Sequence, residues 1–212
     1  FCDLCDWIMQ VWQMRKFLFD ENPHRPTLME PRYEHFFYRL QEVLQASRLH
    51  ELAKLHDPAV QGGAKGHINL SIDYMIEYGR WDTATEDRLR ELNSKMTTLA
   101  KPVKDVRNKI LSHNDLKVLL TSKELGGFDP GEDESYFLRL REFASLVRET
   151  ALGEPFVYDD LVKNDGSSFM KTFLQCFAFG QAGGPGRYCH RSQAAGRYEL
   201  SRALRAVLHS RA

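Results

Sequence analysis

The segment from residue 106 to residue 115 contains the side chains best suited to catalysis, and it reads Val-Arg-Asn-Lys-Ile-Leu-Ser-His-Asn-Asp. An imidazole, with an ordinary pKa of about 6.5, can take a proton from a ribose hydroxyl or give one to a leaving oxygen, and His113 supplies one. A guanidinium stays charged and offers a planar set of donors to phosphate oxygens, and Arg107 supplies it. Asn108 can orient either group. These residue types predict metal-independent cleavage of RNA, with Arg107, Asn108 and His113 as the catalytic residues.

The spacing of this pair leaves a structural interpretation open. On a straight helix Arg107 and His113 would lie roughly 9 Å apart along the axis and about 120° apart around it. They can therefore share a cleft only if a second helix, or a second copy of the chain, closes over them. By spacing alone, His113 fits equally well as a hydrogen-bonded core histidine, with Arg107 as a surface cation.

Charge restricts how RNA can approach this segment. The chain has 29 basic and 29 acidic residues, but residues 180–212 hold six Arg and a single acid, Glu199. The rest of the chain therefore carries about −5, which excludes a general nucleic-acid-binding surface. RNA must be met by local cations, and we expect Lys104, Lys109 and Lys117 to be the RNA-binding residues.

A long helix is predicted to carry these residues. Thr83 and Glu86 fit a capping box at its start. From there an apolar seam at alternating steps of three and four predicts a helix packed lengthwise on other helices; it comprises Leu89, Leu92, Met96, Leu99, Val103, Val106 and Ile110. Continuing the seam leads to His113. Pro102 lies inside it, so we expect a kink there.

Helical spacing of apolar residues recurs elsewhere, and no segment shows the alternation of a strand. Further helices are expected at residues 3–18, from Pro31 to about His56, after a cap at Asn69 and ending at Gly79, and at 135–151. The fold class is therefore all-α, an up-and-down bundle of four to five helices with a weakly ordered C-terminal tail. We assign residues 1–153 to the bundle, 154–179 to an extension with a short helix around Phe169–Phe179, and 180–212 to a Gly/Arg-rich tail of doubtful origin.

No cofactor and no metal site is expected. Cys2 and Cys5 form a single CxxC, and the other thiols, Cys176 and Cys189, are far away in the sequence. A zinc site would need these distant pairs to converge, so reduced thiols are the simpler interpretation. No apolar run is long enough to cross a bilayer, and we expect a cytosolic protein with no membrane partner.

The string Arg107 to His113, on a late helix of a small helical domain, resembles the Arg-polar-His motif of the HEPN superfamily. Three further stretches resemble its abortive-infection, or phage-defence, branch: Leu55-His56-Asp57-Pro58-Ala59, Asn69-Leu70-Ser71, and Ser112 to Asp115. The resemblance covers roughly residues 4–152 and does not cover the tail. Pro102, five residues before the arginine, departs from the pattern.

The resemblance implies a homodimer in which two Arg-polar-His motifs share one cleft. His113 would then be the acid-base residue, Arg107 the phosphate-binding residue and Asn108 the polar helper. It implies an RNA substrate, cleavage to a cyclic phosphate, a role as a toxin or antiviral effector, and an antitoxin protein as a possible partner. The alternative function is a non-catalytic helical module of the same fold that binds protein, nucleotide or RNA.

Overall fold

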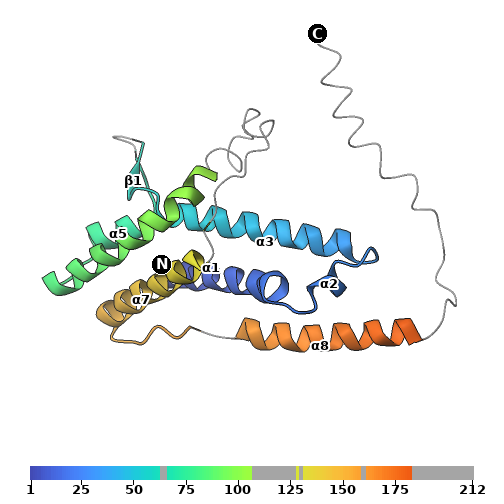
Figure 1. Ribbon diagram of the computed structural model, residues 1–212. Coiled ribbons are helices and arrows are strands. Elements are labelled where there is room, and N and C mark those ends of the chain that lie inside the picture. The colour runs from blue at the N-terminus through green and yellow to red at the C-terminus, as the bar shows by residue number, and fades with distance from the viewer. Residues whose placement is uncertain (63–65, 107–127, 129–130, 159–160, 183–212) are drawn as a thin grey trace, which may run out of the picture. The chain divides into compact units, whose positions relative to one another are not determined.

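The computed structural model describes residues 1–62, 66–106, 128, 131–158 and 161–182, and these residues are mainly helical (Figure 1). The contacts divide the chain into two units, Phe1–Ser168 and Phe169–Ala212. The helices are α1 (Cys2–Arg15), a π-helical turn (Lys16–Asp20), α2 (Arg25–Leu28), α3 (Glu34–Leu55), α4 (Ile72–Tyr78), α5 (Thr83–Val106), α7 (Glu132–Leu152) and α8 (Leu161–Ala182). The all-α prediction is confirmed.

Four long helices of the first unit form a closed ring of contacts. Helix α1 packs on α3, α3 on α5, α5 on α7, and α7 on α1. In Figure 1 the colours show that α1 and α3 run in opposite directions, as do α5 and α7. Each helix therefore has two neighbours within this ring, and its apolar face points to the middle of the bundle.

The core is made of the apolar seams that define these helices in the sequence. Burial of such side chains is the main favourable term in folding, at about 25 cal/mol per Å² of apolar surface. The buried face of α7 consists of Tyr136, Phe137, Leu140, Phe143, Ala144 and Val147. Buried residues of the long helices include Ile8 and Met9 from α1, Leu49, Leu52 and Leu55 from α3, Leu89, Leu92, Met96 and Val103 from α5, and Tyr136, Phe137, Leu140 and Phe143 from α7.

A small hairpin corrects the expectation that the chain has no strand. β1 (Val60–Gln61) pairs antiparallel with β2 (His67–Ile68), and Val60 lies opposite Ile68. Two residues are too few for alternation to show in a sequence, so the strand pattern could not reveal them.

Two helix starts differ from the sequence prediction. Ser71 caps α4, since its Oγ accepts from the Tyr74 N–H at 3.2 Å. The predicted cap, Asn69, instead donates to the Pro58 carbonyl at 2.8 Å. Pro31 lies in a turn, and α3 begins at Glu34. The predicted end of α4 at Gly79 is confirmed.

The start of α5 also differs from the predicted capping box. Asp82, one residue before the predicted cap Thr83, accepts the Thr85 N–H at 2.9 Å. The Glu86 carboxylate pairs with Arg90 at 2.6 Å. The helix thus starts where expected, but with an aspartate as its cap.

The C-terminal extension contains a longer helix than predicted, because α8 spans Leu161–Ala182 and crosses the boundary between the two units. The rest of the Gly/Arg-rich tail, residues 183–212, lies outside the described residues. Among the described residues, no helix is both long and apolar enough to cross a membrane.

Candidate functional site

The predicted catalytic residues Arg107, Asn108 and His113 lie outside the described residues, as do the predicted RNA-binding residues Lys109 and Lys117. Helix α5 ends at Val106, directly before Arg107, and it includes the predicted RNA-binding residue Lys104. The structure therefore shows how the helix that leads to the motif is held.

Helix α5 is fixed along one face by the core. Leu89, Leu92, Met96, Ala100 and Val103 are all buried. They are spaced three or four residues apart, which places them on one side of the helix. The helix is therefore held by the bundle up to its last described turn.

Pro102 weakens the helix itself just before that turn. It lies inside α5, and its ring nitrogen has no hydrogen to donate to the carbonyl of Thr98, four residues earlier. The predicted kink at Pro102 stays a prediction. Helix α5 therefore lacks one hydrogen bond at Pro102. The turn that follows depends more on contacts with the rest of the bundle.

Lys104 makes such a contact. Its Nζ donates to the backbone carbonyl of His56 at 2.7 Å. His56 is the C-terminal cap of α3, directly after its last residue Leu55, and the last carbonyls of a helix have no partner within it. A cation is also favourable there because it opposes the helix dipole. Lys104 therefore joins the last described turn of α5 to the C-terminal end of α3.

The side chain of His56 is held on the other side by α7. Its Nε2 shares a hydrogen bond of 2.9 Å with the hydroxyl of Tyr136. His56 is 7% exposed and Tyr136 is fully buried. Burial, with a smaller effect of the Lys104 charge, lowers the pKa of His56 to about 4. Burial raises the pKa of Tyr136 well above its ordinary value. Both rings are therefore uncharged at neutral pH.

Tyr136 also contacts Phe128, a described residue on the far side of the 107–127 stretch. The two ring centroids lie 5.4 Å apart, and Phe128 packs against the core. Lys104 and Phe128, which are described residues on either side of the 107–127 stretch, thus contact the same pair, His56 and Tyr136. We call Lys104, His56, Tyr136 and Phe128 the Tyr136 cluster.

A buried arginine extends this group toward α1. Arg48 is 5% exposed, and its guanidinium lies 6.0 Å from the Phe128 ring and 3.9 Å from Asp133. Asp133 also accepts a hydrogen bond of 2.9 Å from the Trp12 indole N–H. Burial lowers the pKa of Arg48 to about 10, and the Asp133 charge opposes this shift. Arg48 remains charged at neutral pH and links α3 to α7.

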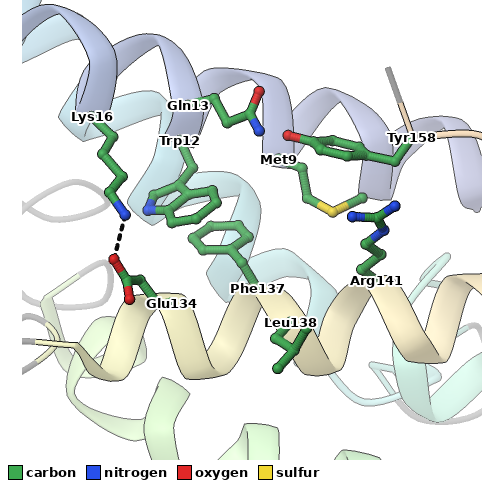
Figure 2. A pocket seen from close by; sticks show the side chains of 9 residues that line it. All are labelled: Met9, Trp12, Gln13, Lys16, Glu134, Phe137, Leu138, Arg141 and Tyr158. Atoms are coloured by element: carbon green, nitrogen blue, oxygen red, sulfur yellow. Dashed lines mark hydrogen bonds and ion pairs between the residues drawn. The ribbon is translucent and has the colours of Figure 1, made fainter. Parts of the chain in front are cut away.

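A hollow of about 370 Å³ lies between α1 and α7 (Figure 2). Its wall is aromatic, since the Trp12 and Phe137 rings stack with centroids 4.3 Å apart. Its volume falls within the range of small-molecule sites, about 300–1,000 Å³. Its Lys16 pairs with Glu134 and with Glu21. This pairing compensates the lysine charge, and a second cation that lines the hollow, Arg141, lies over the Tyr158 ring at 5.1 Å.

The two cysteines of the CxxC are in α1 and are protonated at neutral pH. Cys5 is fully buried, and burial raises its pKa strongly. Cys2 donates to the Ala144 carbonyl with a distance of 3.7 Å, and burial raises its pKa too. A thiolate is the reactive and metal-binding form. Within the described ranges, His, Cys, Asp and Glu side chains form no group of three or more able to hold a metal ion.

The sequence indicated parts of the Tyr136 cluster but not the cluster itself. Tyr136 lies within the predicted 135–151 helix, and His56 lies within a stretch that resembles a known family. Their contact joins residues 80 positions apart, which no local pattern reveals. A tyrosine on an apolar face is a useful indication, because a buried hydroxyl usually needs a partner.

Comparison with known proteins identifies a family. A family model described as HEPN_AbiU2 (AbiU2) matches residues 1–171. Neither the curated proteins nor the solved structures gave a significant match. The matched region includes the four helices of the ring and the segment with Arg107 and His113.

Proposed function

The chain belongs to the abortive-infection AbiU2 family of HEPN domains. On this basis we propose that it is a metal-independent endoribonuclease with Arg107 and His113 in its active site. The observation that carries the proposal is the family match over residues 1–171, which includes both residues. As a HEPN effector it would act on RNA in the cytosol as a toxin or antiviral protein, silenced by an antitoxin.

The chemistry assigned to these residues is intramolecular cleavage of RNA. His113 removes the proton from a ribose 2′-hydroxyl, and the 2′-oxygen attacks the neighbouring phosphorus. The bond to the 5′-oxygen breaks, and that oxygen receives the proton that the imidazole has taken up, so His113 returns to its neutral form. Arg107 stabilises the charge that builds up on the phosphate oxygens. The products are a 2′,3′-cyclic phosphate and a 5′-hydroxyl.

Two further features belong to the proposal. Asn108 orients the imidazole or the phosphate, and Lys109 and Lys117 bind neighbouring phosphates of an RNA that the acidic body would otherwise repel. A homodimer brings two copies of the motif into one cleft, which overcomes the separation of Arg107 and His113 along one helix. The core holds helix α5, which leads to the motif, up to Val103.

The first prediction is that the purified chain cuts RNA in the presence of a chelator and that His113→Ala and Arg107→Ala abolish or strongly reduce this cleavage. His35→Ala is the matched control, since His35 is an exposed histidine on α3. It should cut at the rate of the unmodified chain. Circular dichroism and thermal unfolding should show that all three variants keep the fold.

The competing function, a non-catalytic binding module, gives a different result. In that case no RNA is cut by any variant, while RNA binding or assembly changes in Arg107→Ala or His113→Ala. A purely structural role of His113 would instead appear as a loss of stability in His113→Ala, on the order of a few kcal/mol if the imidazole is buried and hydrogen-bonded.

A further inference from the structure

We infer that Lys104 is a positioning residue, which holds the end of α5 on the Tyr136 cluster so that Arg107 starts from a fixed place. This inference rests on the proposed ribonuclease function. It assigns to Lys104 a role different from the phosphate contact expected from the sequence, and it gives His56 and Tyr136 a role in supporting the active site.

The need for such a residue follows from Pro102. Without the hydrogen bond to the Thr98 carbonyl, the turn from Val103 to Val106 is attached less firmly to the rest of its own helix. The hydrogen bond of 2.7 Å from Lys104 to the His56 carbonyl ties this turn to α3 instead. The buried side chain of Val103 holds the same turn on the core. The end of α5 is thus fixed by contacts between helices.

The acceptor of this hydrogen bond is itself held firmly. His56 is buried and bound through its ring to the hydroxyl of Tyr136, which is fully buried in α7. Three helices, α3, α5 and α7, therefore meet at one point. Phe128 lies against the same tyrosine, so the chain returns to this point after the stretch that contains the catalytic motif.

Covalent geometry carries the effect from Lys104 to Arg107. Arg107 follows Lys104 by three residues in the chain, and covalent bonds pass a displacement of the end of α5 along the backbone. Catalysis is sensitive to small displacements, and a shift of about 1 Å at a reacting group can lower the rate about a hundredfold. A loosened end of α5 should therefore reduce turnover while leaving the charges that attract RNA in place.

The alternative role, a direct contact with RNA, makes opposite predictions. A lysine that binds phosphate contributes to affinity and to its salt dependence, about 0.7–0.9 units in the slope of log K against log salt for each phosphate neutralised. Its loss raises KM and reduces that slope while kcat changes little. A positioning lysine changes kcat and leaves the slope unchanged.

The experiment compares Lys104→Met, which keeps the aliphatic stem and removes the ammonium group, with Lys101→Met as the control. Lys101 is an exposed lysine of the same helix. Lys104→Met should lower kcat about ten- to a hundredfold and leave KM within about threefold, and Lys104→Arg should restore part of the rate. RNA binding, measured in the His113→Ala background, should keep its salt slope. Lys101→Met should leave kcat unchanged.

A second readout does not depend on cleavage. Hydrogen exchange of the backbone amides of residues 103–106 should become faster in Lys104→Met and stay unchanged in Lys101→Met. If the unmodified chain cuts no RNA, the ribonuclease proposal fails, and the exchange rates alone decide whether Lys104 anchors the helix. Unchanged exchange, or faster exchange with unchanged kcat, overturns the inference. A rise in KM with a smaller salt slope overturns it in favour of a phosphate contact.

Discussion

His56 is an imidazole kept uncharged inside a helical bundle. Its ring meets Tyr136 of α7, its carbonyl accepts from Lys104 of α5, and Asp57 follows it in the chain. Burial is the main cause of its low pKa, and the Lys104 charge adds to the effect, while the Asp57 charge opposes it. A proton on His56 would have to be taken up in a buried site beside a cation.

The second prediction is a loss of stability in mild acid. The pKa of His56 is 6.5 in an ordinary environment and about 4 in the folded chain. The unfolded chain therefore binds more protons between these two values, so stability is present above pH 6.5 and is lost as the pH falls toward 4. His56 alone should lower the free energy of unfolding by about 2 kcal/mol between pH 7 and pH 5.

Urea denaturation of His56→Gln at both pH values measures this contribution. The glutamine amide can still bond to the Tyr136 hydroxyl, and it does not titrate. The variant should lose less stability on acidification than the unmodified chain, by about 2 kcal/mol. His67→Gln changes an exposed histidine and should behave like the unmodified chain. An equal acid sensitivity in all three proteins would show that His56 is not held uncharged.

The sequence predicts the candidate catalytic residues but not the contacts that hold the helix leading to them. The residue types at Arg107, Asn108 and His113 suggest the chemistry directly, because few side chains combine acid-base and phosphate-binding roles. The supporting contacts of Lys104, His56 and Tyr136 could not be predicted, because they join three helices that are far apart in the sequence. Arg48 shows the same limit, since its burial comes from the packing of α1, α3 and α7 around it.

Among the helices, α5 shows which of two neighbouring residues caps its N-terminal end. The Thr85 N–H and hydroxyl both donate to the Asp82 carboxylate at 2.9 Å. These hydrogen bonds lower the pKa of Asp82. A cap that accepts in this way satisfies a backbone donor that the helix leaves without a partner.

The third prediction follows from this geometry. Asp82→Ala should lower the melting temperature of the chain, because the first turn of α5 loses its cap and the negative charge favoured at a helix start. Thr83→Ala, the residue expected to cap from the sequence, should have a much smaller effect. Thermal unfolding followed by circular dichroism at neutral pH compares the two. If Thr83→Ala lowered the melting temperature more than Asp82→Ala, the helix would be capped by Thr83 in the predicted capping box and not by Asp82.

The helices themselves could be predicted better than their ends. The seam of α5 and the buried face of α7 repeat over several turns, so one misplaced residue does not hide the pattern. A helix end depends on one side chain, and Asp82 and Thr83 are both good caps. The cap of α4 was equally ambiguous. The structure has Ser71 as the cap and not the predicted Asn69, because the Asn69 amide donates to the Pro58 carbonyl instead.

At the scale of the whole molecule, the ring of α1, α3, α5 and α7 follows from apolar faces that must be buried together. The sequence indicated a bundle, but not which helices touch, because many pairings would bury the same faces. The family match adds residues 1–3 and 153–171 to the region expected from resemblance. The proposed assignment of residues 154–179 to an extension and 180–212 to a tail stays a prediction.

The fourth prediction concerns assembly. The proposed shared cleft requires two copies, so sedimentation should give a mass close to twice the 24.6 kDa of one chain at the concentrations where RNA is cut. The Lys104→Met and His113→Ala variants should sediment in the same way, since neither change is expected to remove the interface. A monomer that cuts RNA at full rate would exclude a cleft formed by two copies.

The most direct test of the central claim is to identify the ends of RNA fragments made in the presence of a chelator. The unmodified chain and His35→Ala should both produce fragments that end in a 2′,3′-cyclic phosphate, as mass spectrometry can show. The His113→Ala preparation, purified in the same way, should produce none. Equal production of these fragments by His113→Ala, or cleavage that requires an added divalent metal, would contradict the account.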